Sequence, residues 1–353
     1  MVIGGLVGMR MEQEVRKVQR LGYSSLGISL PKDWARAVGL SPGSVISVLR
    51  DGDAGLKLMV GAHTKTPEPP CEIEAEAAAG QDGLIRQITG AYIAGRGTIR
   101  IKSKTELTAA QLRETHEAVR GLSGLTIVAQ GPRFVQIENF AEPSRFPIDG
   151  LLRRLHYLTS RMGRLAFSQL ERAMEPGTEE IAKLEEEVDR IYWVLSRQLL
   201  LASTDRGAAT RSGIERGQDI VSHRLMALTL ENVGDLWMEM SEAAAILGPR
   251  AVKDLPQRLA AVRQDLERQG EAAVTSVFSS NVKMANEALD LEPTIVAAVK
   301  ALYMELPVGG PARTIQGCSS CLARRAVLRP LGQVAKLYGT LAHLTINRSL
   351  EPA

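Results

Sequence analysis

The long amphipathic segments that fill this chain from residue 148 onward most constrain its fold. Apolar residues recur there at spacings of three and four, the pattern of helices that bury one face. The segments are about 148–174, 178–203, 208–247, 254–281, 283–304 and 318–349. Turn-forming sequences interrupt them at PGT (176–178), STDRG (203–207), GPR (248–250), DLEP (290–293) and PVGGP (307–311). Six long helices in two sets of three predict two antiparallel three-helix bundles.

The two sets of helices look like copies of each other. RRLHYLTSRMGRLAFSQLERAM, which begins at Arg153, compares with RLAAVRQDLERQGEAAVTSVFSSN, which begins at Arg258. A repeat of about one hundred residues is too long for a solenoid unit, so we interpret it as a duplicated three-helix bundle. Bundle 1 is expected at 148–249 and bundle 2 at 254–350.

The first sixty residues instead predict short strands around one short helix. Strands are expected at 15–20, 26–30, 44–50 and 56–60. The helix KDWARAV follows Pro31, whose missing N–H is tolerated in a first helical turn. About fifty residues give only a thin core, so we expect this N-terminal unit, residues 10–62, to need a partner chain.

A proline-rich stretch at 64–70 predicts a stiff linker to a second small domain at 71–142. The pattern there indicates a β-α-β-α-β-β order, with Thr108 capping the second helix. We therefore expect a mainly α, multi-domain fold with a β-rich N-terminal domain and a small α+β middle domain, whose role the sequence does not indicate.

Composition and the absence of known catalytic motifs argue against several classes of function. The chain has 43 basic and 40 acidic residues, so its overall charge does not demand a polyanionic partner. Aromatic residues make up only 4%, which argues against a base-stacking platform. We find no nucleophile triad, H-E-x-x-H or phosphate-binding glycine loop, so we do not expect an enzyme.

Cysteine content and hydropathy indicate a cytoplasmic protein. Three cysteines cannot form a disulfide framework, and no apolar run reaches the roughly 18 residues that span a bilayer. The opening MVIGGLVGM has no basic leader and no cleavage site, so no signal peptide is expected. Met1, Met9 and Met11 are alternative starts.

The N-terminal unit is locally basic. Residues 10–65 hold nine Lys or Arg against five Asp or Glu, and cations gathered on one face favour binding to nucleic-acid phosphates. The alternative is a dimerisation module whose charges are only solvated. The candidate DNA contacts are Arg16, Lys17, Arg20, Lys32 and Arg36.

Paired acids mark bundle 1. Glu185 and Asp189 stand four residues apart on one expected helix, and Glu231 and Asp235 do so on another. Two such pairs on neighbouring helices could supply four or more oxygen ligands, which suits a divalent metal such as Mg, Mn, Fe or Zn. The alternative is a solvated acidic helix face.

The counterpart positions in bundle 2 lack this pattern. Asn286 and Asp290 replace the first acid pair, and Gly332 and Lys336 replace the second. A lysine ammonium opposes cation binding, so we expect no metal in bundle 2. Cys318 and Cys321 form a C-x-x-C that is half of a zinc site, with a redox pair or an inter-chain zinc as the functional alternatives to inert thiols.

The N-terminal unit resembles the AbrB/SpoVT swapped-hairpin DNA-binding domain. The matching positions are the VRKV strand (15–18), Leu21-Gly22, Pro31, Arg36, Gly39-Leu40 and the final strand pair. Tyr23-Ser24-Ser25 stands where the family has an arginine-bearing segment. The resemblance implies an intertwined dimer over residues 12–60 that binds DNA.

The bundles resemble the PhoU family of phosphate-uptake regulators over residues 148–350. Leu230, Glu231, Gly234 and Asp235 match its second motif, whereas Asn232-Val233 replaces Arg-Ile and Leu236 replaces His. The resemblance implies metal clusters at the carboxylate faces. A swapped-hairpin unit ahead of PhoU-like bundles is an arrangement of archaeal members.

Together the resemblances imply a DNA-binding transcriptional regulator of phosphate homeostasis. The alternative is a dimeric adaptor without DNA binding that docks on the ATPase of a phosphate ABC transporter. An antitoxin-like role ranks third, because it would leave the bundles without a task.

Overall fold

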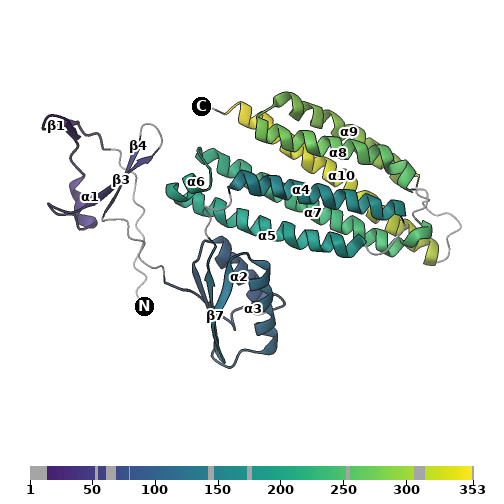
Figure 1. Cartoon of the computed structure of the whole chain (residues 1–353), viewed down its shortest axis with the longest axis horizontal. Coiled ribbons are helices and arrows are strands. Elements are labelled where there is room, and N and C mark those ends of the chain that lie inside the picture. The colour runs from purple at the N-terminus through teal and green to yellow at the C-terminus, as the bar shows by residue number, and fades with distance from the viewer. Residues whose placement is uncertain are drawn as a thin grey trace. The chain divides into compact units, whose positions relative to one another are not determined.

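The computed structural model describes residues 14–51, 55–60, 69–78, 80–141, 147–172, 177–251, 255–305 and 315–351. The chain divides into two compact units, Met1–Pro67 and Glu68–Ala353 (Figure 1). Most of the predicted linker falls outside the described residues. The expected mainly α, multi-domain fold is confirmed.

The first unit contains two hairpins and a short helix. Its elements are β1 (Gln19–Leu21), β2 (Ser25–Gly27), α1 (Lys32–Ala37), β3 (Ile46–Asp51) and β4 (Gly55–Val60). β1 pairs with β2 and β3 pairs with β4, both antiparallel. Gly22 makes the first turn with a φ of +72°, which glycine adopts without strain.

The predicted strands at 15–20 and 26–30 are too long. Pairing runs only from Gln19↔Gly27 to Leu21↔Ser25, so residues 15–18 and 28–30 are not in strands. The tight turn after Leu21 places only three residues opposite each other, and nothing else in the described part of the single chain pairs with the flanking residues. The swapped-hairpin arrangement involves a second chain and stays a prediction.

The second unit begins with an α+β domain in the predicted order. Its elements are β5 (Cys71–Glu74), α2 (Gly83–Ile93), β6 (Thr98–Lys102), α3 (Ala109–Gly121), β7 (Leu125–Gly131) and β8 (Phe134–Asn139). The sheet order is β5-β6-β8-β7, with β5 and β6 parallel across the α2 connection. Thr108 caps α3 reciprocally with Gln111, through Gln111 N–H to Thr108 Oγ1 at 3.2 Å and Thr108 N–H to Gln111 Oε1 at 2.9 Å.

Two three-helix bundles make up the rest of this unit. Bundle 1 contains α4 (Ile148–Arg172), α5 (Gly177–Thr204) and α7 (Gly217–Ala251), with the short α6 (Arg206–Arg211) before α7; bundle 2 contains α8 (Leu255–Ser279), α9 (Val282–Met304) and α10 (Ile315–Ser349). Figure 1 shows the long helices side by side, and one hydrophobic core runs through both bundles. None of the described helices is long and apolar enough to cross a membrane.

One predicted helix start and two predicted interruptions are wrong. The third helix begins at Gly217 rather than at 208, because Asp205 caps a separate α6 through Gly207 N–H at 2.8 Å. α7 continues through the predicted break at 248–250, and α9 continues through Pro293. Ala288 and Ile295 are buried on either side of this proline, so tertiary packing outweighs the lost backbone hydrogen bond.

The packing of aromatic rings repeats between the bundles. A Cβ at Gly163 of α4 would stand 2.9 Å from Trp237 of α7, and a Cβ at Gly270 of α8 would stand 2.7 Å from Tyr338 of α10. In each bundle, a glycine of the first helix therefore lets an aromatic ring of the third helix approach its backbone. This correspondence supports the duplication inferred from the sequence.

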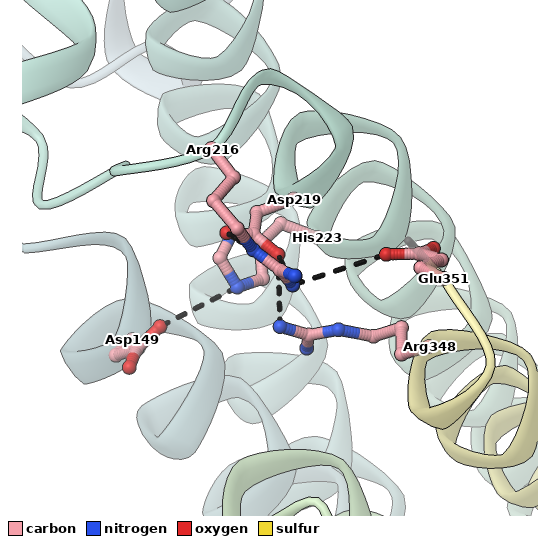
Figure 2. Close-up of polar contacts among 6 residues, drawn as sticks. All are labelled: Asp149, Arg216, Asp219, His223, Arg348 and Glu351. Atoms are coloured by element: carbon pink, nitrogen blue, oxygen red, sulfur yellow. Dashed lines mark hydrogen bonds and ion pairs between the residues drawn. The ribbon is translucent and has the colours of Figure 1, made fainter. Parts of the chain in front are cut away.

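A cluster of charged side chains around the buried Asp219 joins the two bundles (Figure 2). The Asp219 carboxylate accepts hydrogen bonds from Arg216 at 2.8 Å and from Arg348 of α10 at 2.9 Å. Burial works to raise the pKa of Asp219, but the Arg216 hydrogen bond and the Arg348 charge outweigh it and lower this pKa. His223 Nε2 lies 3.5 Å from Asp149 of α4, and burial lowers the pKa of His223. α7 and α10 thus meet at the Asp219 carboxylate, and α4 joins them through His223.

Candidate metal centre and DNA-binding surface

The acid pairs of bundle 1 come together as neighbours on α5 and α7. Glu185, Asp189 and Asp235 each place a carboxylate oxygen within 4.8 Å of the other two. Glu231, one turn before Asp235, is not in this group, although the charges of Asp235 and Asp189 act on it. We call Glu185, Asp189 and Asp235 the carboxylate cluster.

Burial raises the pKa of all four acids at this place, and repulsion by neighbouring carboxylates adds to it for Glu185, Asp189 and Glu231. Burial, followed by the Asp189 and Asp235 charges, raises the pKa of Glu185 to about 7. Burial and the Asp235 charge raise the pKa of Asp189 to about 6, and burial with the Asp235 charge raises that of Glu231 to about 7. Burial alone raises the pKa of Asp235. Without a cation, the cluster therefore retains protons near neutral pH.

The donor set fits a hard or borderline divalent cation. All the ligand atoms are carboxylate oxygens, and no Lys, Arg or His of the described residues forms an ion pair within 4 Å of the carboxylate cluster. Glu185 and Asp189 are half-buried and Asp235 is exposed, so coordination positions remain open to water or to an anion. A bound cation would displace the retained protons and remove the repulsion.

The middle domain docks beside the cluster along one stripe of α5. Asp189, Trp193 and Arg197 follow at intervals of four, which places them on one helix face. Trp193 packs against the middle domain's core, and the buried Arg197 donates to the carbonyls of Gly95 at 3.0 Å, Arg96 at 3.2 Å and Tyr92. These carbonyls end α2, where a helix presents unsatisfied acceptors and partial negative charge.

A groove of about 610 Å³ lies between the middle domain and α5. It is lined by Arg120 and Thr89 of the middle domain and by Asp189 and Arg190 of α5. The middle domain, whose role the sequence did not indicate, thus borders the carboxylate cluster. The four-residue spacing from Glu185 to Arg197 is the signal in the sequence that could have indicated this contact.

The equivalent place in bundle 2 has different chemistry. Asn286 and Asp290 are exposed on α9, and Lys336 of α10 lines a shallow pocket together with Lys300 and Arg329. Lys336, the sequence counterpart of Asp235, therefore lies beside other cations rather than beside acids. The side chains of Cys318 and Cys321, on α10, lie outside the part of the chain that is described.

All five candidate DNA contacts are exposed, but they differ in setting. Arg16 and Lys17 precede β1, and Arg16 forms an ion pair with Glu14. Arg20 donates to the Tyr23 carbonyl at 3.0 Å, within the first hairpin. Lys32 and Arg36 lie at the two ends of α1.

The N-terminal unit exposes large apolar side chains. Tyr23 is 99% exposed, Val15 87% and Leu26 75%, and Leu56 and Val45 are also largely exposed. No residue of α1 is buried. So many exposed large apolar side chains in one small unit are typical of a surface that another chain covers. It supports the expectation that this unit folds against a second copy.

We predict that the full-length protein is a dimer held by its N-terminal unit. Light scattering should give twice the chain mass of 38.3 kDa. Leu56→Glu should give the monomer mass, because a charge would then have to be buried in the interface. Ile246→Glu is the control, since Ile246 is equally apolar and 80% exposed but lies on α7. A wild-type mass of one chain would contradict the prediction.

Two family models match the sequence. Residues 19–68 match antidote-toxin recognition MazE, bacterial antitoxin, and residues 152–244 match the PhoU domain. The first match covers most of the N-terminal unit but begins after Arg16 and Lys17, and the second covers most of bundle 1 with all four acids. Neither the curated proteins nor the solved structures gave a match. The chain thus combines an N-terminal region similar to the MazE/AbrB-like domains with a helical region similar to the PhoU domain, as the two resemblances predicted.

Proposed function

We propose that this protein is a DNA-binding regulator of phosphate homeostasis whose bundle 1 binds a divalent metal ion. The observation that carries the proposal is the carboxylate cluster, which lies within the region that matches the PhoU domain. The same chain has a locally basic unit that matches the MazE family model. One part would contact DNA and the other would sense phosphate status.

In this proposal the N-terminal unit binds DNA as a dimer. Two copies double the basic face, and each Lys or Arg at a phosphate releases counterions, which supplies affinity that depends on salt. The exposed cations at both ends of α1 and around the first hairpin fit phosphate contacts better than base contacts. Tyr23-Ser24-Ser25 stands where the family has an arginine-bearing turn, which is consistent with contacts to phosphates rather than to bases.

The carboxylate cluster would hold Mg, Mn, Fe or Zn. Glu185, Asp189 and Asp235 are the proposed ligands, and Glu231 would join through water or by a change of rotamer. The groove beside Asp189 gives the middle domain access to this site. We therefore propose that the middle domain responds to occupancy of the cluster through α5.

A gel-shift titration tests the DNA-binding part. The full-length protein should bind its own upstream region more tightly than a scrambled sequence, at each of two salt concentrations. Arg16→Ala should weaken binding to both sequences and lower the salt slope by about one. Arg268→Ala serves as the control, because Arg268 is exposed on α8, far along the chain from the N-terminal unit. Unchanged affinity of Arg16→Ala at low salt would contradict the assignment of Arg16.

The adaptor remains the second candidate, because bundle 1 exposes an apolar stripe. Val221, Leu225 and Leu228 of α7 are exposed at intervals of four and three, on one helix face. Such a stripe suits docking on a protein, and an ATPase of a phosphate ABC transporter is the partner that the family resemblance implies. An adaptor would bind the upstream region no better than the scrambled control.

A further inference from the structure

A cavity of about 330 Å³ lies where the first helices of the two bundles face each other. α4 and α8 form its walls, and aromatic rings of Phe167, Trp237 and Tyr338 line it. These rings are almost completely buried. The volume is at the lower end of the range for sites of small metabolites. The cavity includes none of the carboxylate cluster, so it is independent of the proposed metal site.

The glycines described above shape this cavity. Gly163 and Gly270 both line it, and each allows an aromatic ring to lie against the backbone of α4 or α8. A Cβ at either position would collide with that ring at 2.7–2.9 Å. The duplication thus builds a two-sided aromatic site at the junction of its halves.

Trp237 and Arg164 each bring to the cavity a hydrogen-bond donor that has no partner among the described residues. Trp237 is 3% exposed, and its Nε1–H makes no hydrogen bond. Arg164 is exposed at the mouth and forms no ion pair with a described residue, although its charge reaches Tyr338. Both groups only donate, so an occupant that satisfies them must bring acceptors.

The acids at the mouth already have partners. Glu267 accepts from Arg263 at 3.1 Å, and Glu271 lies 3.4 Å from His156 Nε2. Burial lowers the pKa of His156, although Glu271 opposes this, so the imidazole is neutral at pH 7. Glu271 keeps its negative charge, but it accepts hydrogen bonds from Thr275 at 3.2 Å and from the neutral His156. The one charged group that faces the cavity without a hydrogen-bond partner in the described part of the chain is therefore the Arg164 guanidinium.

The geometry points to a binding site for a small aromatic anion, with its ring among Phe167, Trp237 and Tyr338 and its anionic oxygens on Arg164. Apolar burial in the aromatic lining and a charge-assisted hydrogen bond at the mouth act on opposite ends of such a molecule. A carboxylate and a phosphate monoester both provide these oxygens. Neutral or cationic analogues would leave the guanidinium without a partner.

Fluorine NMR of the full-length protein labelled with 5-fluorotryptophan tests this site. The chain has three tryptophans, so Trp34 and Trp193 are internal controls, and Trp237→Phe assigns the third signal. Benzoate and phenyl phosphate are the anionic probes, and benzyl alcohol and benzylammonium are the neutral and cationic ones. We expect a saturable shift of the Trp237 signal with an anionic probe, and the tighter probe identifies carboxylate or phosphate as the preferred group.

Arg164→Met should weaken that binding about tenfold or more, because it removes a charged hydrogen bond. Arg161→Met is the matched control: the same change on α4, at a residue that pairs with Glu180 and does not line the cavity. Ser160→Phe should fill the cavity and abolish the shift. The site is refuted if no anionic probe shifts Trp237, if benzyl alcohol or benzylammonium binds equally well, or if Arg164→Met and Arg161→Met behave alike.

Discussion

Replacing Asp219 with alanine is expected to lower the free energy of unfolding by about 3 kcal/mol, since it removes the shared acceptor of two arginines. Arg216 and Arg348 both donate to this carboxylate, and the Arg348 side chain is only 17% exposed. Alanine would leave the Arg348 charge buried without its acceptor. Because Arg348 lies on α10, the loss would also loosen the junction of the two bundles.

Urea unfolding of the full-length protein, followed by helical circular dichroism, measures this effect. Asp265→Ala is the matched control, because Asp265 pairs only with Arg268 among the described residues, three positions later on the same helix and at 3.7 Å. That exposed pair should contribute about 0–1 kcal/mol. If Asp219→Ala destabilises the chain no more than Asp265→Ala does, the Asp219 cluster does not hold the bundles together.

The Asp219 cluster should also weaken in acid. The pKa of Asp219 is lowered, so its contribution is present above the ordinary aspartate range and is lost as the pH falls through its folded pKa. The pKa of His223 is lowered too, so the unfolded chain takes up a proton below about pH 6.5 that the folded chain resists. Both groups therefore favour unfolding as the pH falls.

Helical periodicity predicts most of the fold because it is a local property. Each helix of the bundles buries a stripe that repeats every three to four residues, so existence and approximate length can be read from the sequence. The errors arise where contacts between residues far apart in the sequence determine where a helix or strand ends. α9 continues through Pro293 because its neighbours are buried on both sides, and β1 is short because the turn after Leu21 leaves residues 15–18 unpaired.

The same distinction applies to the sites. Each acid pair was visible because its members are four residues apart on one helix. Which acids meet across two helices depends on how α5 and α7 are rotated, and here Glu231 stays outside the group that Asp235 joins. The Asp219–Arg348 contact spans 129 residues, and the aromatic cavity combines four helices, so no local pattern indicates either.

Metal binding is expected to reverse the way in which stability depends on pH. Without metal, the folded cluster retains protons that the unfolded chain releases near pH 4 to 5. Its raised pKa values therefore stabilise the fold below that range, and this contribution is lost as the pH rises through about 6 to 7. The acids are half-exposed and screened by solvent, so we expect a total loss on the order of 1–2 kcal/mol.

A divalent ion should restore this stability above pH 7. It binds the ionised carboxylates of the folded state only, and at a hundred times its Kd it adds about 2.7 kcal/mol. Asp189→Asn combined with Asp235→Asn should abolish the gain and flatten the pH dependence of the metal-free protein. Asp290→Asn, at an exposed aspartate on α9 of bundle 2, should change neither.

Thermal unfolding at pH 5 and pH 8, with and without Mn²⁺, measures the reversal, and elemental analysis measures bound metal. The comparison of pH values and the comparison with and without Mn²⁺ together distinguish a metal site from an acidic surface that binds no metal. An acidic face that only repels itself would respond to pH and to the double substitution, but Mn²⁺ would stabilise the wild type and the variant equally. If metal still binds after both substitutions, these carboxylates are not its ligands. The same conclusion follows if no metal is found in the wild type after reconstitution with Fe, Mn, Mg and Zn. A gain confined to the wild type at pH 8 requires ionised Asp189 and Asp235, because asparagine preserves their shape and removes only their charge.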